Sequence, residues 1–173
     1  LNCMLVNARS LNKKTTDNLL NILFVDEKID LCCITETWLK PGDHAFVADI
    51  KLRGYKIVSS PRANNKRGGG IAFLCKDMYK YNQIKTSKHC MFELLEVVFI
   101  CKNSLVRFFT IYRTGNLNIE QKAKFLQELN DYLDSLLSKQ GINIIWGDFN
   151  ISNNKTTNKK FYVEFMDLIT TSR

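Results

Sequence analysis

The stretch NIIWGDFNI, Asn143–Ile151, joins a run of apolar residues directly to a run of polar ones. The apolar part has the character of a buried strand, yet Asp148 and Asn150 follow it at once. A carboxylate and an amide at the end of such a strand need a partner, because a buried polar group without one is costly. The rest of the chain has to supply or indicate that partner.

The size and composition of the chain predict one folded domain. It has 173 residues, of which 45% are hydrophobic and 11% aromatic, so we expect a single domain over residues 1–173 rather than a disordered chain. No apolar run approaches the roughly 20 residues of a membrane helix, and no signal peptide is recognisable. We therefore expect an intracellular protein without a membrane association. The chain begins at Leu1, without an initiating Met, which suggests a fragment.

The net charge of the chain indicates a class of binding partner. Lys and Arg number 25 against 17 Asp and Glu, and the net charge of +8 favours a polyanion such as nucleic acid. A merely soluble basic surface would give the same charge.

The six cysteines form no CxxC pair, so they indicate reduced core residues rather than zinc ligands or disulfides. They are Cys3, Cys32, Cys33, Cys75, Cys90 and Cys101.

Hydrophobic periodicity predicts strands that outnumber helices, which favours a layered mixed α/β fold over a simple doubly wound sheet. The expected strands are residues 1–7, 29–35, 54–60, 70–76, 94–102, 106–112 and 142–146. The expected helices are residues 15–28, 116–141 and 161–169.

Each predicted helix carries its own signals. In the first, Thr16 or Asp17 is the expected cap. In the second, Asn118 and Gln121 form a capping box and Gly141 ends the helix. The apolar stripes expected on the three helices are Leu19, Leu20, Leu23 and Phe24; Ile119, Ala123, Leu126, Leu129, Leu133 and Leu136; and Phe161, Phe165 and Leu168.

Four predicted strands end in polar side chains, which are Asn7, Glu36, Tyr112 with Arg113, and Asp148 with Asn150. The carboxyl ends of parallel strands gather at one edge of a sheet, so we expect these side chains to meet there. Any one of them alone would be explained by an ordinary surface turn. In an extended chain, Asp148 and Asn150 would point to the same side and Phe149 to the core.

The chemistry of these strand ends suits a metal ion and a phosphate. Mg²⁺ is usually held by one or two carboxylates and keeps waters that leave room for a substrate phosphate. Glu36 and Asp148 offer the carboxylates, while Asn7 and Asn150 can orient them or donate hydrogen bonds to phosphate oxygens. The sequence therefore predicts that the partner of Asp148 is Mg²⁺ together with a phosphate group.

Six segments occur in the order seen in the endonuclease/exonuclease/phosphatase superfamily: NARSLNKK, LCCITETWL, RGGGIAFLCK, LLEVVF, FFTIYR and IIWGDFNI. The chain most resembles the endonuclease domain of non-LTR retrotransposon polyproteins, mainly through TETWL followed by GDFN. The resemblance implies an α/β fold, a four-layer sandwich of two facing mixed β-sheets flanked by helices. It also implies that the carboxyl-terminal part of the domain is missing from this chain.

The same resemblance implies a function, which is Mg²⁺-dependent nicking of DNA by a domain fused to a reverse transcriptase and acting in the nucleus. It makes Glu36 a metal ligand, with Asn7 as a supporting metal residue, and implies that Tyr112 contacts the phosphate or tunes the site. Asp148 would position or activate the attacking water, and Asn150 would stabilise charge on the phosphoryl oxygens. The alternatives are a decayed remnant that at most binds DNA, or a phosphatase of the same superfamily.

The chain departs from the family pattern at two places. Arg9 stands where many relatives have Asp. The Ser-Asp-His motif of the family would lie beyond Arg173, and neither His44 nor His89 matches it. We therefore expect the 173 residues alone to be inactive and to expose a sheet edge and apolar surface.

Basic residues near the predicted site are candidates for binding DNA phosphates, although a solvated loop would explain several of them equally well. They are Arg9, Arg62, Lys66, Arg67 and Arg113. The segment KRGGGIAF resembles a phosphate-binding loop, but it lacks the Gly-Lys-Ser/Thr ending and precedes a strand. It predicts a tight turn instead.

Overall fold

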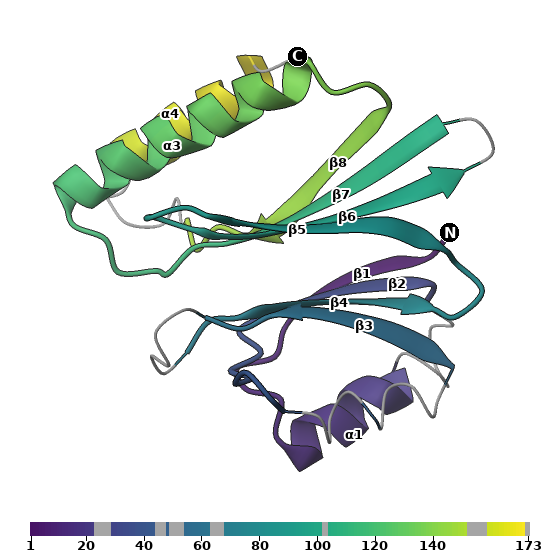
Figure 1. Cartoon of the computed structure of the whole chain (residues 1–173). Coiled ribbons are helices and arrows are strands. Elements are labelled where there is room, and N and C mark those ends of the chain that lie inside the picture. The colour runs from purple at the N-terminus through teal and green to yellow at the C-terminus, as the bar shows by residue number, and fades with distance from the viewer. Residues whose placement is uncertain are drawn as a thin grey trace.

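Two four-stranded sheets lie face to face, and helices cover the outer face of each, which gives four layers (Figure 1). This computed structural model describes residues 1–22, 29–43, 48, 54–62, 68–101, 104–151 and 159–171. The first sheet has the order β1 (Cys3–Asn7), β2 (Leu31–Thr35), β4 (Ile71–Lys76) and β3 (Tyr55–Ser60), with α1 (Lys13–Asn21) outside it. The second has the order β5 (Tyr81–Lys88), β6 (Glu93–Cys101), β7 (Ser104–Tyr112) and β8 (Ile142–Asp148), with α3 (Ile119–Leu137) and α4 (Lys159–Thr171) outside it.

Both sheets are mixed, and in each the parallel pair lies at one edge. β1 runs parallel to β2, and β7 runs parallel to β8, whereas all other neighbouring strands are antiparallel. The predicted four-layer α/β architecture is therefore confirmed. In the described sheets β1 and β8 are edge strands, and Leu5 and Ile145 on them are 41% and 39% exposed.

The space between the sheets holds an aromatic core. Side chains alternate along a strand, so Ile71 and Phe73 of β4 face the second sheet while Ala72 and Leu74 face α1. Phe73 packs on Trp146 with ring centroids 5.9 Å apart. Burial on both faces explains why β4 reads as one continuous apolar run.

The capping box of α3 is confirmed. The Asn118 side chain accepts the Gln121 N–H at 2.8 Å, and the Gln121 side chain accepts the Asn118 N–H at 3.0 Å. The predicted stripe is partly wrong, because Ile119 is 84% exposed and Phe125 is fully buried. A stripe that includes Ile119 and one that includes Phe125 both fit the helical period. The docking of α3 on the second sheet selects Phe125, together with Leu129, Leu133 and Leu136.

Other predicted elements need correction. α1 begins at Lys13 with Asn12 as its cap, rather than at Thr16 or Asp17. β5 was not predicted, because YNQIKTSK has little apolar alternation and is an edge strand held by backbone pairing with β6. The predicted helix face at Leu23 and Phe24 lies outside the described residues. On α4, Phe161 and Phe165 are buried as predicted.

The cysteines are only partly core residues. Cys32, Cys33 and Cys75 are free and buried, and burial raises the pKa of Cys32 to about 12 and that of Cys75 to about 11. Cys3 and Cys90 are free but exposed. The prediction of reduced core residues therefore holds for the three on β2 and β4 and is wrong for these two.

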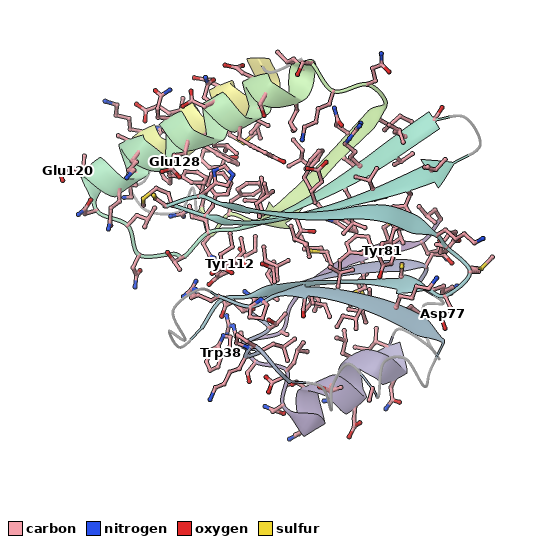
Figure 2. All side chains as sticks on the ribbon, in the orientation of Figure 1. Trp38, Asp77, Tyr81, Tyr112, Glu120 and Glu128 are labelled. Atoms are coloured by element: carbon pink, nitrogen blue, oxygen red, sulfur yellow. The ribbon has the colours of Figure 1, made fainter. Side chains whose placement is uncertain are left out.

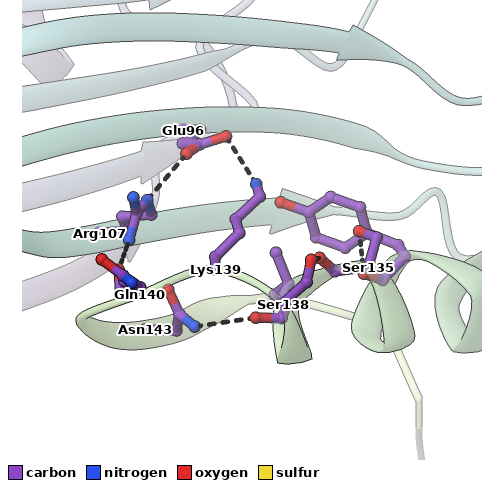
Figure 3. A network of polar contacts seen from close by, with 9 residues as sticks. Glu96, Arg107, Ser135, Ser138, Lys139, Gln140 and Asn143 are labelled. Atoms are coloured by element: carbon purple, nitrogen blue, oxygen red, sulfur yellow. Dashed lines mark hydrogen bonds and ion pairs between the residues drawn. The ribbon is translucent and has the colours of Figure 1, made fainter.

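A buried carboxylate ties the segment after α3 to the second sheet (Figure 3). Glu96 of β6 is 6% exposed and forms ion pairs with Arg107 at 3.7 Å and with Lys139 at 3.3 Å. These contacts balance its charge, which would be costly to bury alone.

None of the described helices has the length and apolar character that a bilayer crossing requires.

Candidate active site

The predicted strand ends converge at the carboxyl ends of the two parallel pairs. Asn7 ends β1 opposite Thr35 of β2, and Asp148 ends β8 opposite Tyr112 of β7. Parallel neighbours end at the same edge of a sheet, and the two sheets lie face to face. In Figure 2, Tyr112 lies between the sheets and Trp38 lies toward the same end of them.

One amide joins the two sheets at this edge. The Asn7 Nδ2 donates a hydrogen bond to Glu36 Oε1 at 2.8 Å and another to Asp148 Oδ2 at 2.7 Å. Glu36 follows β2 of the first sheet, whereas Asp148 ends β8 of the second. Asn7 and Asp148 are 141 positions apart in the chain, yet their contact brings the Asp148 carboxylate to the same side-chain amide that binds Glu36.

Tyr112 adds a neutral phenol to this group. Its side chain is 5% exposed, and burial raises the pKa of the phenol to about 12. The Glu36 carboxylate contributes to the raised pKa through its charge and its hydrogen bond with the phenol. Tyr112 is therefore protonated at neutral pH and can act as a hydrogen-bond donor.

The raised pKa of Tyr112 predicts a loss of stability in alkali. The neutral phenol is favoured in the folded state, so its contribution is complete below a pH of about 10 and is lost as the pH rises to about 12. In metal-free buffer, the Tyr112→Phe protein should lose less free energy of unfolding between these pH values than the wild type. Urea denaturation at both pH values measures this, with Tyr162→Phe as control. An identical pH dependence of the Tyr112→Phe and wild-type proteins would contradict it.

The segment after β8 is a turn, not an extended strand. Asn150 has a φ of 50°, and its backbone N–H donates to Asp148 Oδ1 at 3.1 Å. The prediction that an extended backbone puts both side chains on one side is therefore wrong, and the turn brings the Asn150 backbone N–H to the Asp148 carboxylate instead. Phe149 packs in the core as predicted, with its ring centroid 5.0 Å from that of Phe165.

Arg113 shapes this turn from inside the protein. It is 1% exposed, and its guanidinium donates to the carbonyl oxygens of Phe149 at 2.6 Å and Asn150 at 2.7 Å. Its own carbonyl accepts the Asn150 Nδ2 at 2.7 Å. The prediction that Arg113 binds DNA is wrong, because its side chain is buried and its donors hold the backbone. Sequence reasoning missed this positioning role, and nothing in the sequence distinguishes it from a surface arginine.

The backbone is strained where the site residues lie. In the described part of the chain, the non-glycine residues with positive φ are Arg9, Ser10, Glu36, Trp38 and Asn150. All of them follow the strands that end at the site, and such conformations persist only where surrounding contacts impose them. Ser10 N–H donates to the Glu36 carbonyl at 2.8 Å, so the segments after β1 and β2 hold each other.

The donor set fits a hard divalent cation held by few protein ligands. Within the described residues, no cluster of three or more His, Cys, Asp and Glu could hold a metal. Glu36 and Asp148 do meet at Asn7, and one or two carboxylates with waters are the usual ligands of Mg²⁺. The Asn7 Oδ1 accepts the Arg9 N–H at 3.1 Å. In this arrangement Asn7 orients the two carboxylates, and its role as a metal ligand stays a prediction.

The structure describes only some of the remaining basic residues and histidines considered in the sequence analysis. Arg9 is exposed, Arg62 pairs with Glu93 at 2.5 Å, and the predictions for Lys66 and Arg67 lie outside the described residues. His44 also lies outside them. His89 stacks on Phe92 with ring centroids 4.1 Å apart, and Phe92 belongs to the cluster between the second sheet and the helices.

A cavity of about 460 Å³ adjoins the end of β8. Asp148 and Asn150 form part of its wall, and Phe149, Tyr162 and Phe165 add aromatic surface. Asn7, Glu36 and Tyr112 are not among its lining residues, so the recess borders the end of β8 on the side of α4 rather than the contact between the two sheets.

Comparisons with known proteins bear on the fold of the chain. The sequence model of the Endonuclease/Exonuclease/phosphatase family matches residues 4–162. An AP endonuclease from Archaeoglobus fulgidus has a similar structure, with a TM-score of 0.66, 15% identity, and coverage of 95% of this chain and 69% of that one. A humanized D. rerio TDP2 gives 0.62 and 17% identity, covering 90% of this chain and 65% of that one.

D. rerio TDP2 complexed with a single-strand DNA product is also similar, with a TM-score of 0.60, 16% identity and coverage of 88% of this chain. The chain spans 65% and 56% of the length of the two D. rerio TDP2 chains. No curated protein sequence matches it significantly. Identities this low establish the shared fold and nothing finer.

Proposed function

Because this chain belongs to the endonuclease/exonuclease/phosphatase family, as the match over residues 4–162 shows, we propose that it hydrolyses DNA phosphodiester bonds with Mg²⁺. More narrowly, it is the DNA-nicking endonuclease domain of a non-LTR retrotransposon protein, joined to a reverse transcriptase and acting in the nucleus. The narrower proposal rests on the sequence resemblance carried by TETWL and GDFN.

The observation that carries the proposal is the meeting of Glu36 and Asp148 at the Asn7 amide. Two carboxylates brought together from separate sheets repel each other unless a cation or donors compensate them. Bound there, Mg²⁺ would supply positive charge that stabilises charge developing on the phosphoryl oxygens. Glu36 would hold the ion, and Asn7 would keep both carboxylates oriented.

The other residues act on the substrate. Asp148 can orient the attacking water through its carboxylate. The neutral Tyr112 phenol has one O–H, which is hydrogen-bonded to Glu36, and it would donate to a phosphate oxygen once a cation takes its place at Glu36. The Asn150 amide has two N–H donors, one of which is used by the Arg113 carbonyl. Its second N–H is the donor that we assign to the phosphate.

DNA is the favoured substrate for two reasons. The net charge of +8 suits a polyanion. Among proteins of similar structure, one is an AP endonuclease and another is a TDP2 bound to a single-strand DNA product. Arg9, two residues after Asn7, is exposed, and we assign to it a contact with a phosphate next to the one that reacts.

The 173 residues alone are expected to bind Mg²⁺ but to be inactive in nicking DNA. The family resemblance assigns the proton-transfer partner of Asp148 to a histidine in a Ser-Asp-His segment. Among the described residues, the one histidine is His89, which packs on Phe92. A polypeptide that contains this domain together with a Ser-Asp-His segment is therefore the form in which nicking should be measured.

Binding of Mg²⁺ to the 173-residue chain tests the proposal. We expect Glu36→Gln to weaken Mg²⁺ binding by at least about tenfold, because the amide removes a charged oxygen ligand. Isothermal titration calorimetry measures the affinity, and circular dichroism checks the fold. Glu120→Gln, an exposed carboxylate on α3, is the matched control and should bind as the wild type does. Wild-type protein that binds no Mg²⁺ would leave at most a DNA-binding remnant.

A further inference from the structure

The carboxylate of Glu93 lies at the same edge of the two sheets as the candidate site. Glu93 is the first residue of β6, and its register partner on β7 is Tyr112. Directly opposite residues of an antiparallel pair point to the same face, and Tyr112 belongs to the core between the sheets. Glu93 therefore reaches from the second sheet toward the first at the edge of that core.

Both oxygens of Glu93 bind groups of the first sheet. Oε1 accepts the Arg62 Nε at 2.5 Å, and Oε2 accepts the Gly70 backbone N–H at 2.6 Å. Arg62 lies just after β3, and Gly70 lies just before β4. The side chains of Arg62 and Glu93 are only 21% and 23% exposed, so solvent weakens these contacts less than it would at an open surface. One carboxylate thus joins the two sheets.

From Gly70 the contacts lead to Glu36. The carbonyl of Gly70 accepts the Thr37 N–H at 3.2 Å, and that of Gly69 accepts the Trp38 N–H at 2.9 Å. Glu36 precedes these two residues and has a φ of 54°, a conformation that its neighbours must impose. Holding the backbone of Gly70 therefore holds the segment that orients the Glu36 carboxylate.

From Arg62 the contacts lead to Tyr112. The Arg62 guanidinium lies over the Tyr112 ring, 5.8 Å from its centroid. Its positive charge lowers the pKa of the phenol, in opposition to burial and to Glu36. Because Glu93 holds the guanidinium, it sets where this charge lies relative to Tyr112.

The same contacts explain the triple glycine that resembles a phosphate loop. Gly68, Gly69 and Gly70 have φ values of 88°, 70° and 84°, which side chains rarely allow. A Cβ on Gly69 would collide with the Arg62 guanidinium, and one on Gly70 would lie 2.6 Å from Thr37 Oγ1. The Gly70 N–H, which is one of the loop donors, is bound to Glu93 and not to a phosphate.

We propose that Glu93 is a positioning residue that holds Glu36 and Tyr112 in place across the two sheets, through Gly70 and Arg62. The proposal rests on the proposed function, since it assigns to Glu93 the geometry of that site. Glu93 acts through other groups and is not placed in contact with substrate.

The test compares Glu93→Gln with Glu128→Gln in the 173-residue chain. Glutamine keeps the shape of the side chain but removes the charge that binds Arg62. Glu128 is a matched control on α3 (Figure 2), because its Oε2 also accepts two backbone N–H groups, those of Cys90 and Met91 at 3.1 Å. Hydrogen exchange reports on the Thr37 and Trp38 amides, and calorimetry reports on the affinity for Mg²⁺.

We expect Glu93→Gln to speed exchange at Thr37 and Trp38 and to weaken Mg²⁺ binding by about tenfold, the usual effect of losing an outer partner of a metal ligand. Glu128→Gln should change neither. If Glu93→Gln leaves Mg²⁺ affinity unchanged, whatever the exchange rates, the proposal is overturned and Glu93 is only structural. If wild-type protein binds no Mg²⁺, the proposed function fails and this proposal fails with it. Mg²⁺ binding by the wild type therefore distinguishes the failure of the proposed function from the failure of this proposal alone.

Discussion

Asp148→Asn should slow the nicking of supercoiled plasmid by about a hundred- to a thousandfold, the usual effect of losing one preorganised polar group of an active site. The substitution keeps the size of the side chain but removes the negative charge that orients the attacking water. The turn after β8 should persist, because an amide oxygen can still accept the Asn150 N–H now bound at 3.1 Å. Conversion of supercoiled to open-circular plasmid, measured with Mg²⁺ and with a chelator, gives the rate.

The experiment needs the domain joined to a Ser-Asp-His segment and a matched control. Asp131→Asn on α3 alters an exposed carboxylate whose contact is with Gln127 of the same helix, so it should nick as the wild type does. Nicking by the Asp148→Asn protein at the wild-type rate, with the fold intact by circular dichroism, would remove Asp148 from the reaction. Nicking that persists in chelator would exclude the dependence on Mg²⁺.

Arg113→Met should lower the free energy of unfolding by about 3 kcal/mol or more, because each buried acceptor left without a donor costs roughly 1–3 kcal/mol. The carbonyl oxygens of Phe149 and Asn150 would lose their guanidinium donors. The Arg113 guanidinium carbon lies 5.3 Å from the ring centroid of Phe125, and this cation–π contact would be lost as well. Urea denaturation followed by circular dichroism measures the change.

Lys124→Met is the control for this substitution, since Lys124 is exposed on α3 and should alter the free energy of unfolding little. The Arg113→Met protein should also nick more slowly, because the turn that carries Asp148 and Asn150 loses its support. A protein of unchanged stability with weakened DNA binding would mean instead that Arg113 contacts DNA, as its sequence position had suggested.

Patterns within a few residues predicted local structure well where one interaction dominates. The capping box at Asn118 and Gln121 formed because its partners lie three residues apart. The run at β4 was identified as a strand because both its faces are apolar. β5 escaped prediction because an edge strand needs no apolar pattern when its neighbour supplies the backbone hydrogen bonds.

Site residues were predictable as types and less so as contacts. Polar residues at strand ends indicated Asn7, Glu36, Tyr112 and Asp148, since the ends of parallel strands gather. Arg113 and Glu93 were beyond sequence reasoning, because an arginine that holds a turn and one that binds DNA have the same neighbours in the chain. The burial of the side chain and its hydrogen-bond partners distinguish the two kinds of arginine, and both features are set only when the chain folds.

The sequence by itself determined the alternation of strands and helices, the family and the set of side chains able to bind a cation and a phosphate. The alternation of elements follows from local periodicity, the set of side chains from residue types, and the family from motifs such as TETWL and GDFN, and none of these depends on distant contacts. Only the tertiary structure decided that Asn7 links carboxylates of two different sheets, that Asn150 reaches Asp148 through a turn, and that Arg113 is buried. The physical reason is that each of these contacts joins groups whose separation is set by the packing of one sheet on the other or by the turn after β8.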